Sequence, residues 1–240
     1  MRVLLYSKFG QYPQNLEQFV KDSGLDIVKE NPDVVITFGG DGTLLGAERD
    51  FPAVPKLPLK ESGIGYHAIQ KPIEETLELF TGNKLQIRQY FKLEVTFGEK
   101  KFLALNEVTI RNSLPTSALR FSVESHPEQR PINIGHVEGS PTILIGDGLI
   151  VSTPYGSSGY FYSVTRKTFE SGIGLAFNNV HNANPQHQIL DESAEIKVKI
   201  LRGPGQLAVD NNPDLIDLLE TAEITIKKSP EFAKIFTIVQ

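Results

Sequence analysis

The pattern of apolar residues changes near residue 85, and this change restricts the fold more than any other feature. Before it, strand-like and helix-like segments alternate: Arg2 to Tyr6 and Asp33 to Phe38 predict strands, and Gln14 to Ser23 and Pro72 to Phe80 predict helices, with a further helix start at Leu44 to Arg49. Val34 to Ile36 is continuously apolar, as expected of a parallel strand covered on both faces. Strand alternating with helix predicts an open α/β layer.

After residue 85 the chain consists of short segments rich in β-branched and aromatic residues, separated by Gly, Pro, Asn and Asp: 85–88, 92–97, 102–111, 119–123, 143–151, 196–200 and 223–227. This spacing predicts a mostly antiparallel β domain. We therefore expect an α/β, Rossmann-like domain over 1–84, completed by the C-terminal tail 228–240. A β-rich, sandwich-like domain is expected over 85–227.

Composition excludes several classes of function. The 240 residues carry a net charge of −5, whereas a nucleic-acid binder usually carries a basic face. No apolar run approaches the roughly 20 residues needed to span a bilayer. Cysteine is absent, so the chain has no disulfide, no catalytic thiolate and no zinc–cysteine site. We expect a cytoplasmic protein whose partners are small molecules rather than nucleic acid or membrane.

The glycine loop, Gly39-Gly40-Asp41-Gly42-Thr43, places one carboxylate among three glycines directly after the apolar strand. Glycine lets backbone N–H groups approach a ligand closely, and a strand, a glycine turn and a helix start together form an anion site. Asp41 would repel a phosphate, so this interpretation requires a metal, a substrate proton to accept, or both. The alternative is an ordinary turn whose acid stabilises the helix dipole.

A polar pair, Asn106-Glu107, interrupts the apolar strand that runs from Leu105 to Ile110. The amide and the carboxylate offer groups that bind ribose hydroxyls or an amide. The alternative is a strand end or a bulge whose side chains face water.

A third segment, 147–160, reads DGLIVSTPYGSSGY and joins a glycine-flanked acid, Asp147, to a hydroxyl-rich glycine turn. Ser157, Ser158 and Tyr160 are able to hydrogen-bond a polar ligand, and Tyr160 can stack on a base. Taken alone, the segment also fits a decorated β-turn. Other chemistry is not indicated, because GxSxG and HExxH motifs are absent and the five histidines are scattered.

In this order and at these spacings, the three segments resemble the signatures of the NAD kinase family: a GGDGT loop, an NE pair in a later strand, and a DGLIVSTPTGSTAY segment. Here they read GGDGTLL at 39–45, NE at 106–107 and DGLIVSTPYGSSGY at 147–160. The GGDGT loop is shared with diacylglycerol and sphingosine kinases, whereas the third segment is far more specific. The resemblance runs from the first strand to about residue 160, and more weakly to the end.

The resemblance implies a kinase that uses Mg²⁺ or another divalent cation. It would transfer a phosphoryl group from ATP or polyphosphate to the 2′-hydroxyl of the adenosine ribose of NAD, giving NADP. It also implies that the donor phosphates are held by Gly39, Gly40, Gly42 and Thr43. Asp41 would accept the hydroxyl proton and help to place Mg²⁺. Arg49 stands where the family often has a basic residue.

For NAD, the resemblance implies that Asn106 and Glu107 bind the ribose and neighbouring groups. Asp147 would contact the nicotinamide end, and Ser158, Gly159 and Tyr160 would hold the adenine side and its ribose. The β-rich domain would thus be the NAD-binding domain. Members of the family assemble as dimers or tetramers, so a homodimer or homotetramer is expected.

Two segments depart from the family pattern. Leu59 to Tyr66 replaces a GINxGxLGFL segment, although Gly65 and an aromatic residue, Tyr66, are kept. In the third segment Tyr155 replaces a small residue, and it either fills part of the pocket or stacks on the ligand; Ser158 replaces a threonine, Gly159 an alanine, and 161–167 the segment SLSAGGP. Two alternatives therefore stay open: a nucleotide-binding regulator of the same fold with weak or no kinase activity, and a GGDGT kinase for another small-molecule acceptor.

Overall fold

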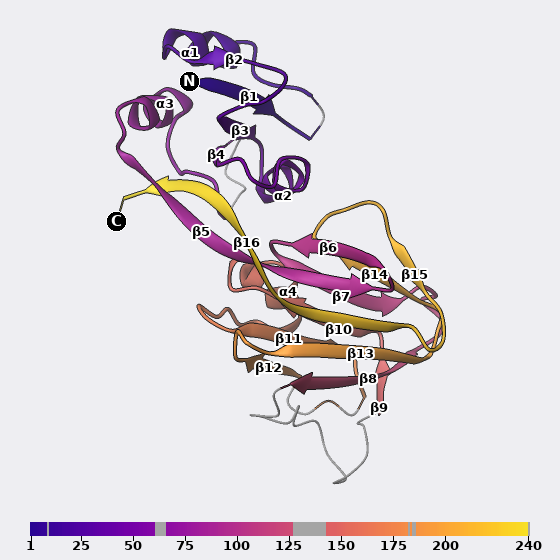
Figure 1. The fold of residues 1–240 in the computed structure, drawn as a ribbon. Coiled ribbons are helices and arrows are strands. Elements are labelled where there is room, and N and C mark those ends of the chain that lie inside the picture. Colours follow the sequence, from indigo (N-terminus) through magenta and orange to yellow (C-terminus); the bar gives the residue numbers. More distant parts are fainter. Residues whose placement is uncertain (9, 61–65, 127–142, 182, 184–185, 240) are drawn as a thin grey trace. The chain divides into compact units, whose positions relative to one another are not determined.

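The computed structural model describes residues 1–8, 10–60, 66–126, 143–181, 183 and 186–239. The described chain divides into two compact units (Figure 1). Unit 1 contains Met1–Tyr90 together with the residues from Phe232 onward, and unit 2 contains Phe91–Glu231. Among the described residues, no helix is long and apolar enough to cross a membrane.

Unit 1 is built on a parallel sheet. Its strands follow the order β2 (Asp26–Ile27), β1 (Arg2–Tyr6), β3 (Val34–Phe38) and β4 (Lys56–Leu59), and the last part of β16 (Glu223–Ile238) runs parallel to β4. Its helices are α1 (Leu16–Asp22), α2 (Asp41–Asp50) and α3 (Ile73–Thr81). This is the alternation of strand and helix that the first 80 residues predict.

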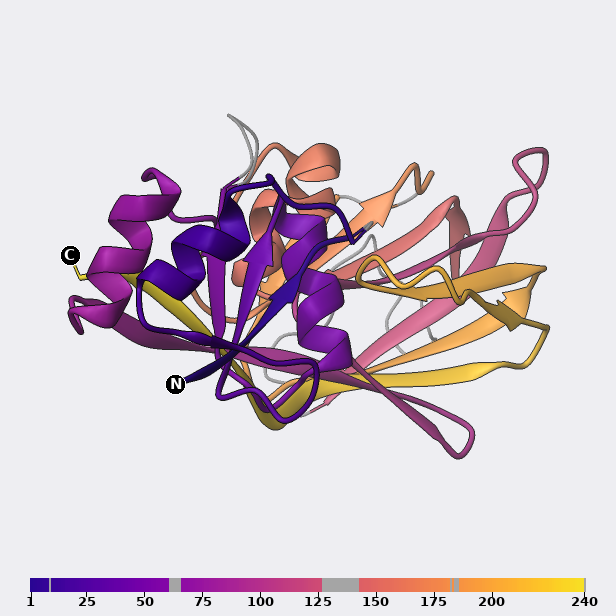
Figure 2. The same cartoon turned by 90° about the horizontal axis from the view of Figure 1, so that it is seen from above.

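Both faces of this sheet are covered. On one face Val3 and Ile36 lie in an apolar core with α1 and α3, and on the other face Val35 packs with Ala47 of α2. Figure 2 shows α1 and α3 on one side of the strands and α2 on the other. The apolar run 34–36 therefore belongs to a strand that is buried on both faces.

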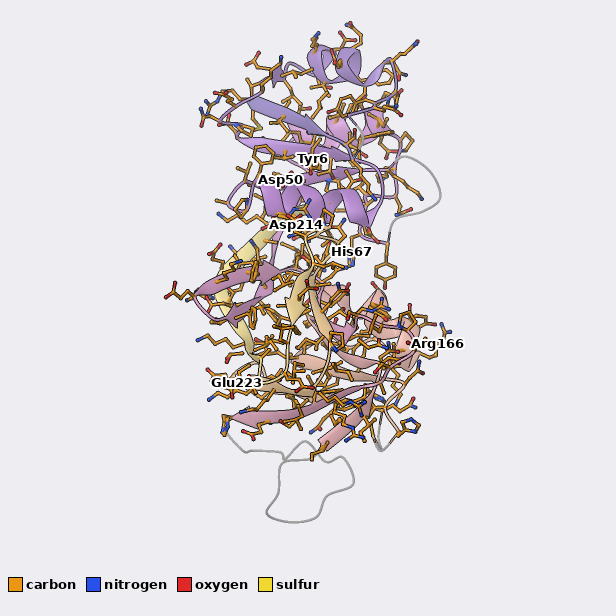
Figure 3. All side chains as sticks on the ribbon, turned by 90° about the vertical axis from the view of Figure 1, so that its right-hand side faces the viewer. Tyr6, Asp50, His67, Arg166, Asp214 and Glu223 are labelled. Atoms are coloured by element: carbon orange, nitrogen blue, oxygen red, sulfur yellow. The ribbon has the colours of Figure 1, made fainter. Side chains whose placement is uncertain are left out.

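Helix α2 is fixed to the sheet at two points. The Tyr6 hydroxyl of β1 donates to the Asp50 carboxylate at 2.7 Å (Figure 3), and Gly46 leaves room for this ring, because a Cβ there would lie 2.8 Å from the hydroxyl oxygen. Burial, followed by the hydrogen bond to Asp50, raises the pKa of Tyr6 to about 12. Glu48 pairs with the buried Lys56 at the start of β4. These contacts orient the helix start, which carries the glycine loop.

Unit 2 is a sandwich of two sheets with antiparallel strand pairs. In the first sheet β16 is followed by β13 (Glu195–Arg202), β8 (Leu119–His126) and β9 (Ile143–Gly146), and β5 (Leu85–Phe97) pairs with both β16 and β6 (Lys100–Ala104). The second sheet has the order β12 (His187–Leu190), β11 (Ile173–Asn178), β10 (Gly148–Ser152), β7 (Glu107–Asn112), β14 (Gly205–Val209) and β15 (Ile216–Leu218).

Inward-facing side chains of the two sheets form one core. Val95, Phe121 and Val198 contribute from the first sheet, and Val151 and Leu175 from the second. All five side chains are at most 1% exposed. The expected fold class, an α/β domain followed by a β-rich domain, is confirmed.

Some predicted elements differ from the structure. The strand predicted over Ile143 to Val151 is two strands, β9 and β10, which belong to different sheets, and Asp147 lies between them. The helix predicted from Leu44 begins earlier, at Asp41. The strands predicted over 85–88 and 92–97 are one continuous strand, β5. The predicted strand 102–111 is interrupted after Ala104, where β6 ends and a turn leads into β7.

Candidate functional site

The glycine loop connects β3 to α2 in unit 1. Gly39 has a φ of +142°, and a Cβ there would lie 2.5 Å from the Thr43 hydroxyl oxygen, so only glycine fits without a shift. At Gly40, by contrast, a Cβ would meet nothing within 4 Å. Thr43 donates its N–H to the Gly40 carbonyl at 2.9 Å, which closes the first turn of the helix. The backbone conformation at position 39 therefore requires glycine, whereas glycine at position 40 leaves the loop accessible to a ligand.

A pocket of about 300 Å³ lies at this loop and is lined by Ser7, Lys8, Gln11, Phe38, Gly40, Gly42 and Thr43. The start of a ten-residue helix carries partial positive charge, and Lys8 adds a full positive charge. Both favour an anionic ligand such as a phosphate group. Lys8 was not identified from the sequence, because it stands before the loop in a stretch without a motif.

Asp41 is the first residue of α2. Its carboxylate accepts the backbone N–H groups of Tyr66 and His67, each at 3.0 Å. The acid thus occupies the helix start, as the turn interpretation predicts, and it also holds the segment after residue 65 against the loop. Residues 61–65, including the predicted Gly65, lie outside the described residues. Across the described chain, no group of three His, Cys, Asp or Glu side chains is gathered to hold a metal.

Two further predicted residues are placed less centrally. Arg49 is in the last turn of α2, about 12 Å along the helix axis from Asp41, and its Nε lies 3.5 Å from the Asp50 carboxylate. The Tyr66 side chain is 74% exposed and packs edge-on against the His67 ring. The backbone N–H of Tyr66 contacts the loop at Asp41.

The 105–107 turn (Leu105, Asn106 and Glu107) leads into β7 in unit 2. Asp210, which follows β14, accepts all three backbone N–H groups of the turn at 2.8, 2.8 and 3.0 Å. Its own N–H donates to the Glu107 carbonyl at 2.9 Å. Sequence reasoning missed Asp210, and the only signal was its place in an Asp-Asn-Asn-Pro stretch that is typical of a turn.

Thr153 holds the same turn from the other side. Its hydroxyl donates to the Leu105 carbonyl at 2.6 Å and accepts the Gly156 N–H at 3.0 Å, while its own N–H donates to the Asn106 carbonyl at 2.9 Å. A Cβ at Gly156 would lie 2.3 Å from the Asn106 carbonyl oxygen, so this position requires glycine. The second and third motifs, distant in sequence, therefore form one packed structure.

Two side-chain oxygens of the 105–107 turn have no hydrogen-bond partner among the described residues. They are Asn106 Oδ1 and Glu107 Oε2, and both are buried. The backbone N–H of Tyr160 donates to the Glu107 carboxylate, but burial and the nearby Asp210 charge outweigh it and raise the pKa of Glu107 to about 8. Buried polar atoms are nearly always satisfied, so these two oxygens indicate a polar ligand.

The remainder of the third motif forms the walls of this region. The motif continues from Thr153 into a 3₁₀ helix, η1 (Tyr155–Ser158), and then into α4 (Tyr160–Thr165). Tyr155 is only 6% exposed, so it fills space rather than lying open for stacking. The Ser157 hydroxyl donates to the Pro154 carbonyl at 2.7 Å and therefore serves the fold. Ser158 is the last residue of η1, and Gly159 joins it to α4; a Cβ at Gly159 would be 3.5 Å from Glu107 Oε2.

Asp147 is not brought to this region. It precedes β10, whereas Ser152 ends it, so the five residues of the strand separate Asp147 from the 105–107 turn by about 16 Å. Its carboxylate accepts the Asn179 amide N–H at 2.8 Å. The structure thus divides the predicted residues of unit 2 between the two ends of β10.

Comparison with known proteins gives one consistent result. An NAD kinase of Sulfurisphaera tokodaii is 31% identical over 238 residues, which span 95% of this chain and 89% of that protein. The crystal structure of yeast NADH kinase complexed with NADH has a TM-score of 0.83 at 17% identity, covering 100% of this chain and 84% of that chain. An NAD kinase from Archaeoglobus fulgidus in complex with ATP has a TM-score of 0.79 at 18% identity, covering 99% of this chain and 94% of that chain. No family model matches the chain. At these identities the two structures show a shared fold.

Proposed function

The chain belongs to the NAD kinase family, and from this premise we propose that it transfers the terminal phosphoryl group of ATP or polyphosphate to the 2′-hydroxyl of the adenosine ribose of NAD, giving NADP. The observation that carries the proposal is the pair of buried, unpartnered oxygens on Asn106 and Glu107. An amide and a carboxyl group in this state are suited to bind the hydroxyl groups of a ribose.

Unit 1 supplies the donor side. The glycine loop and the pocket beside it would hold the phosphates, with the helix start and Lys8 supplying positive charge. Asp41 would accept the proton of the attacking hydroxyl, and its two oxygens keep lone pairs beyond the N–H groups they bind. Phosphoryl transfer depends on such positioning and charge neutralisation rather than on covalent chemistry.

The residues present fit a magnesium ion. Mg²⁺ is usually held by one or two carboxylates together with substrate phosphates and water, and Asp41 is one carboxylate beside a phosphate-type pocket. When bound, the ion would neutralise negative charge on the donor phosphates. Asp41 and the phosphates would hold it.

Unit 2 supplies the acceptor side. Asn106 and Glu107 would bind the adenosine ribose, and Ser158, Gly159 and Tyr160 would hold the adenine side. Asp147 would contact the nicotinamide end, and its place at the opposite end of β10 supports a role apart from the reacting ribose. Four further points stay predictions: cofactor binding by Arg49, cofactor binding by Tyr66, a cytoplasmic location, and a homodimer or homotetramer.

One assay tests the function. The purified protein is incubated with Mg²⁺, with ATP or polyphosphate, and with a panel of acceptors that includes NAD, NADH, a diacylglycerol and a sugar. We expect NADP or NADPH as the product with at least one donor. Stabilisation by NAD in a thermal melt without any NADP would instead show a binding protein, because ligand binding alone raises stability.

A further inference from the structure

The 105–107 turn is fixed by an acid that the three motifs do not contain. Four hydrogen bonds join Asp210 to this turn, three accepted by its carboxylate and one donated by its backbone. Asp210 Oδ1 accepts from both Asn106 and Glu107, and Oδ2 accepts from Leu105. One carboxylate therefore binds the backbone of both residues that carry the unpartnered oxygens.

The same carboxylate is part of a small group of charges. Lys92 of β5 is 2% exposed, and its positive charge acts on Asp210. Asp210 in turn acts on Glu107, to which the Tyr160 backbone N–H also donates. The buried cation thus acts on Asp210, and Asp210 with burial favours a protonated Glu107.

We propose that Asp210 is a positioning residue for the acceptor nucleotide: it holds the 105–107 turn in its binding conformation and places a second acid beside Glu107. The inference rests on the proposed function and names a residue that serves it.

A proton on Glu107 changes what this side chain offers to a ligand. A protonated carboxyl group donates one hydrogen bond and accepts others, whereas a carboxylate only accepts. Ribose hydroxyls are both donors and acceptors, so the protonated form can match either orientation of a hydroxyl. It also avoids adding a negative charge next to the diphosphate of NAD. Asp210 accepts three backbone N–H hydrogen bonds, and these favour its ionised form. The negative charge is therefore better placed on Asp210 than on Glu107.

The experiment combines a direct titration with kinetics. In protein labelled with ¹³C at glutamate carboxyl groups, the resonance absent from Glu107→Gln belongs to Glu107, and its midpoint is followed with pH. We expect a midpoint near pH 8 in the unchanged protein, and in Asp210→Asn a midpoint at least about one unit lower, because a like charge has been removed. In Asp210→Asn we also expect the KM for NAD to rise about tenfold, while the KM for the phosphoryl donor changes less than about twofold.

Asp217→Asn is the matched control, since Asp217 is an exposed aspartate of the same unit in β15; it should alter neither the midpoint nor either KM. An unchanged midpoint in a folded Asp210→Asn, or an equal rise of both KM values, would overturn the inference. Should Asp210→Asn not fold, a midpoint near the ordinary value of Glu in the unchanged protein overturns it as well. If the unchanged protein forms no NADP, the proposed function fails separately, and the titration and the NAD dissociation constant still decide the inference.

Discussion

The glycine loop of unit 1 and the 105–107 turn of unit 2 each contain an acid, but the surroundings of the two carboxyl groups differ. Both oxygens of Asp41 accept a backbone N–H, and the helix start adds positive potential. Glu107 instead has a buried oxygen without a partner among the described residues and a second acid beside it. The loop therefore holds its acid in fixed hydrogen bonds, in a position suited to a base and a cation ligand. The turn favours an acid whose charge changes with pH and with a bound ligand.

The largest expected effect concerns the acid of the loop. Asp41→Asn keeps the size of the side chain and one of its two accepted N–H bonds, but it removes the base. NADP formation should fall by about 10²- to 10⁴-fold, the usual contribution of a general base. The NAD dissociation constant, measured by calorimetry, should stay within about threefold, since the acceptor is held by unit 2. NADP formation close to that of the unchanged protein would remove Asp41 from the catalytic step.

The two regions also differ in how far the sequence predicts them. The glycine loop is local: strand, glycines, acid and helix start follow each other within a few residues, and backbone chemistry predicts its form. The 105–107 turn depends on Asp210, which is 103 residues from Glu107, and on Thr153 from the third motif. Such pairing across strands is set by sheet register, which a single sequence does not show.

Unpredicted elements have a similar cause. Strand β4 contains a lysine and a proline, which break the apolar pattern of a strand, yet Lys56 is buried because Glu48 neutralises it. Helix α4 consists of aromatic and β-branched residues that are typical of strands; it forms because Phe161 packs with Ile150 and Ala176 of the neighbouring sheet. Tertiary contacts determine the secondary structure of both segments, which local propensity alone does not predict.

A second prediction separates two glycines within the loop. Gly39→Ala should reduce the free energy of unfolding by about 1–3 kcal/mol, because a positive φ and the Thr43 hydroxyl both oppose a Cβ. Gly40→Ala should leave stability nearly unchanged, since its Cβ meets nothing within 4 Å, but should raise the KM for the phosphoryl donor by narrowing the approach to the pocket. Urea unfolding and donor kinetics measure the two effects. Equal loss of stability in both variants would contradict the distinction.

A third prediction concerns the pH dependence of stability. The pKa of Glu107 is raised by burial first and by Asp210 second, to about 8 in the folded protein. Between the unfolded value of about 4.5 and pH 8, the folded state keeps a proton that the unfolded state has lost. Stability from this group is therefore full at low pH and falls with rising pH, by about 1.4 kcal/mol per unit within that window.

Glu107→Gln removes this titration and isolates it from all other groups. The difference in unfolding free energy between the variant and the unchanged protein, measured in urea at pH 6.5 and 7.5, should grow in favour of the variant as pH rises. Asp210, whose pKa is raised mainly by burial to about 6, contributes in the same direction but at lower pH. Parallel pH profiles for the two proteins would show that Glu107 does not hold an extra proton.

The smallest expected effect tests the other support of the turn. Thr153→Val removes the hydroxyl that donates to the Leu105 carbonyl and accepts the Gly156 N–H, and it leaves both groups buried without that partner. The free energy of unfolding should fall by about 1 kcal/mol and the KM for NAD should rise a few-fold. Thr153→Ser keeps the hydroxyl and is the matched control, with near-normal values for both. If the serine variant were as impaired as the valine variant, the hydroxyl alone would not explain how Thr153 supports the turn.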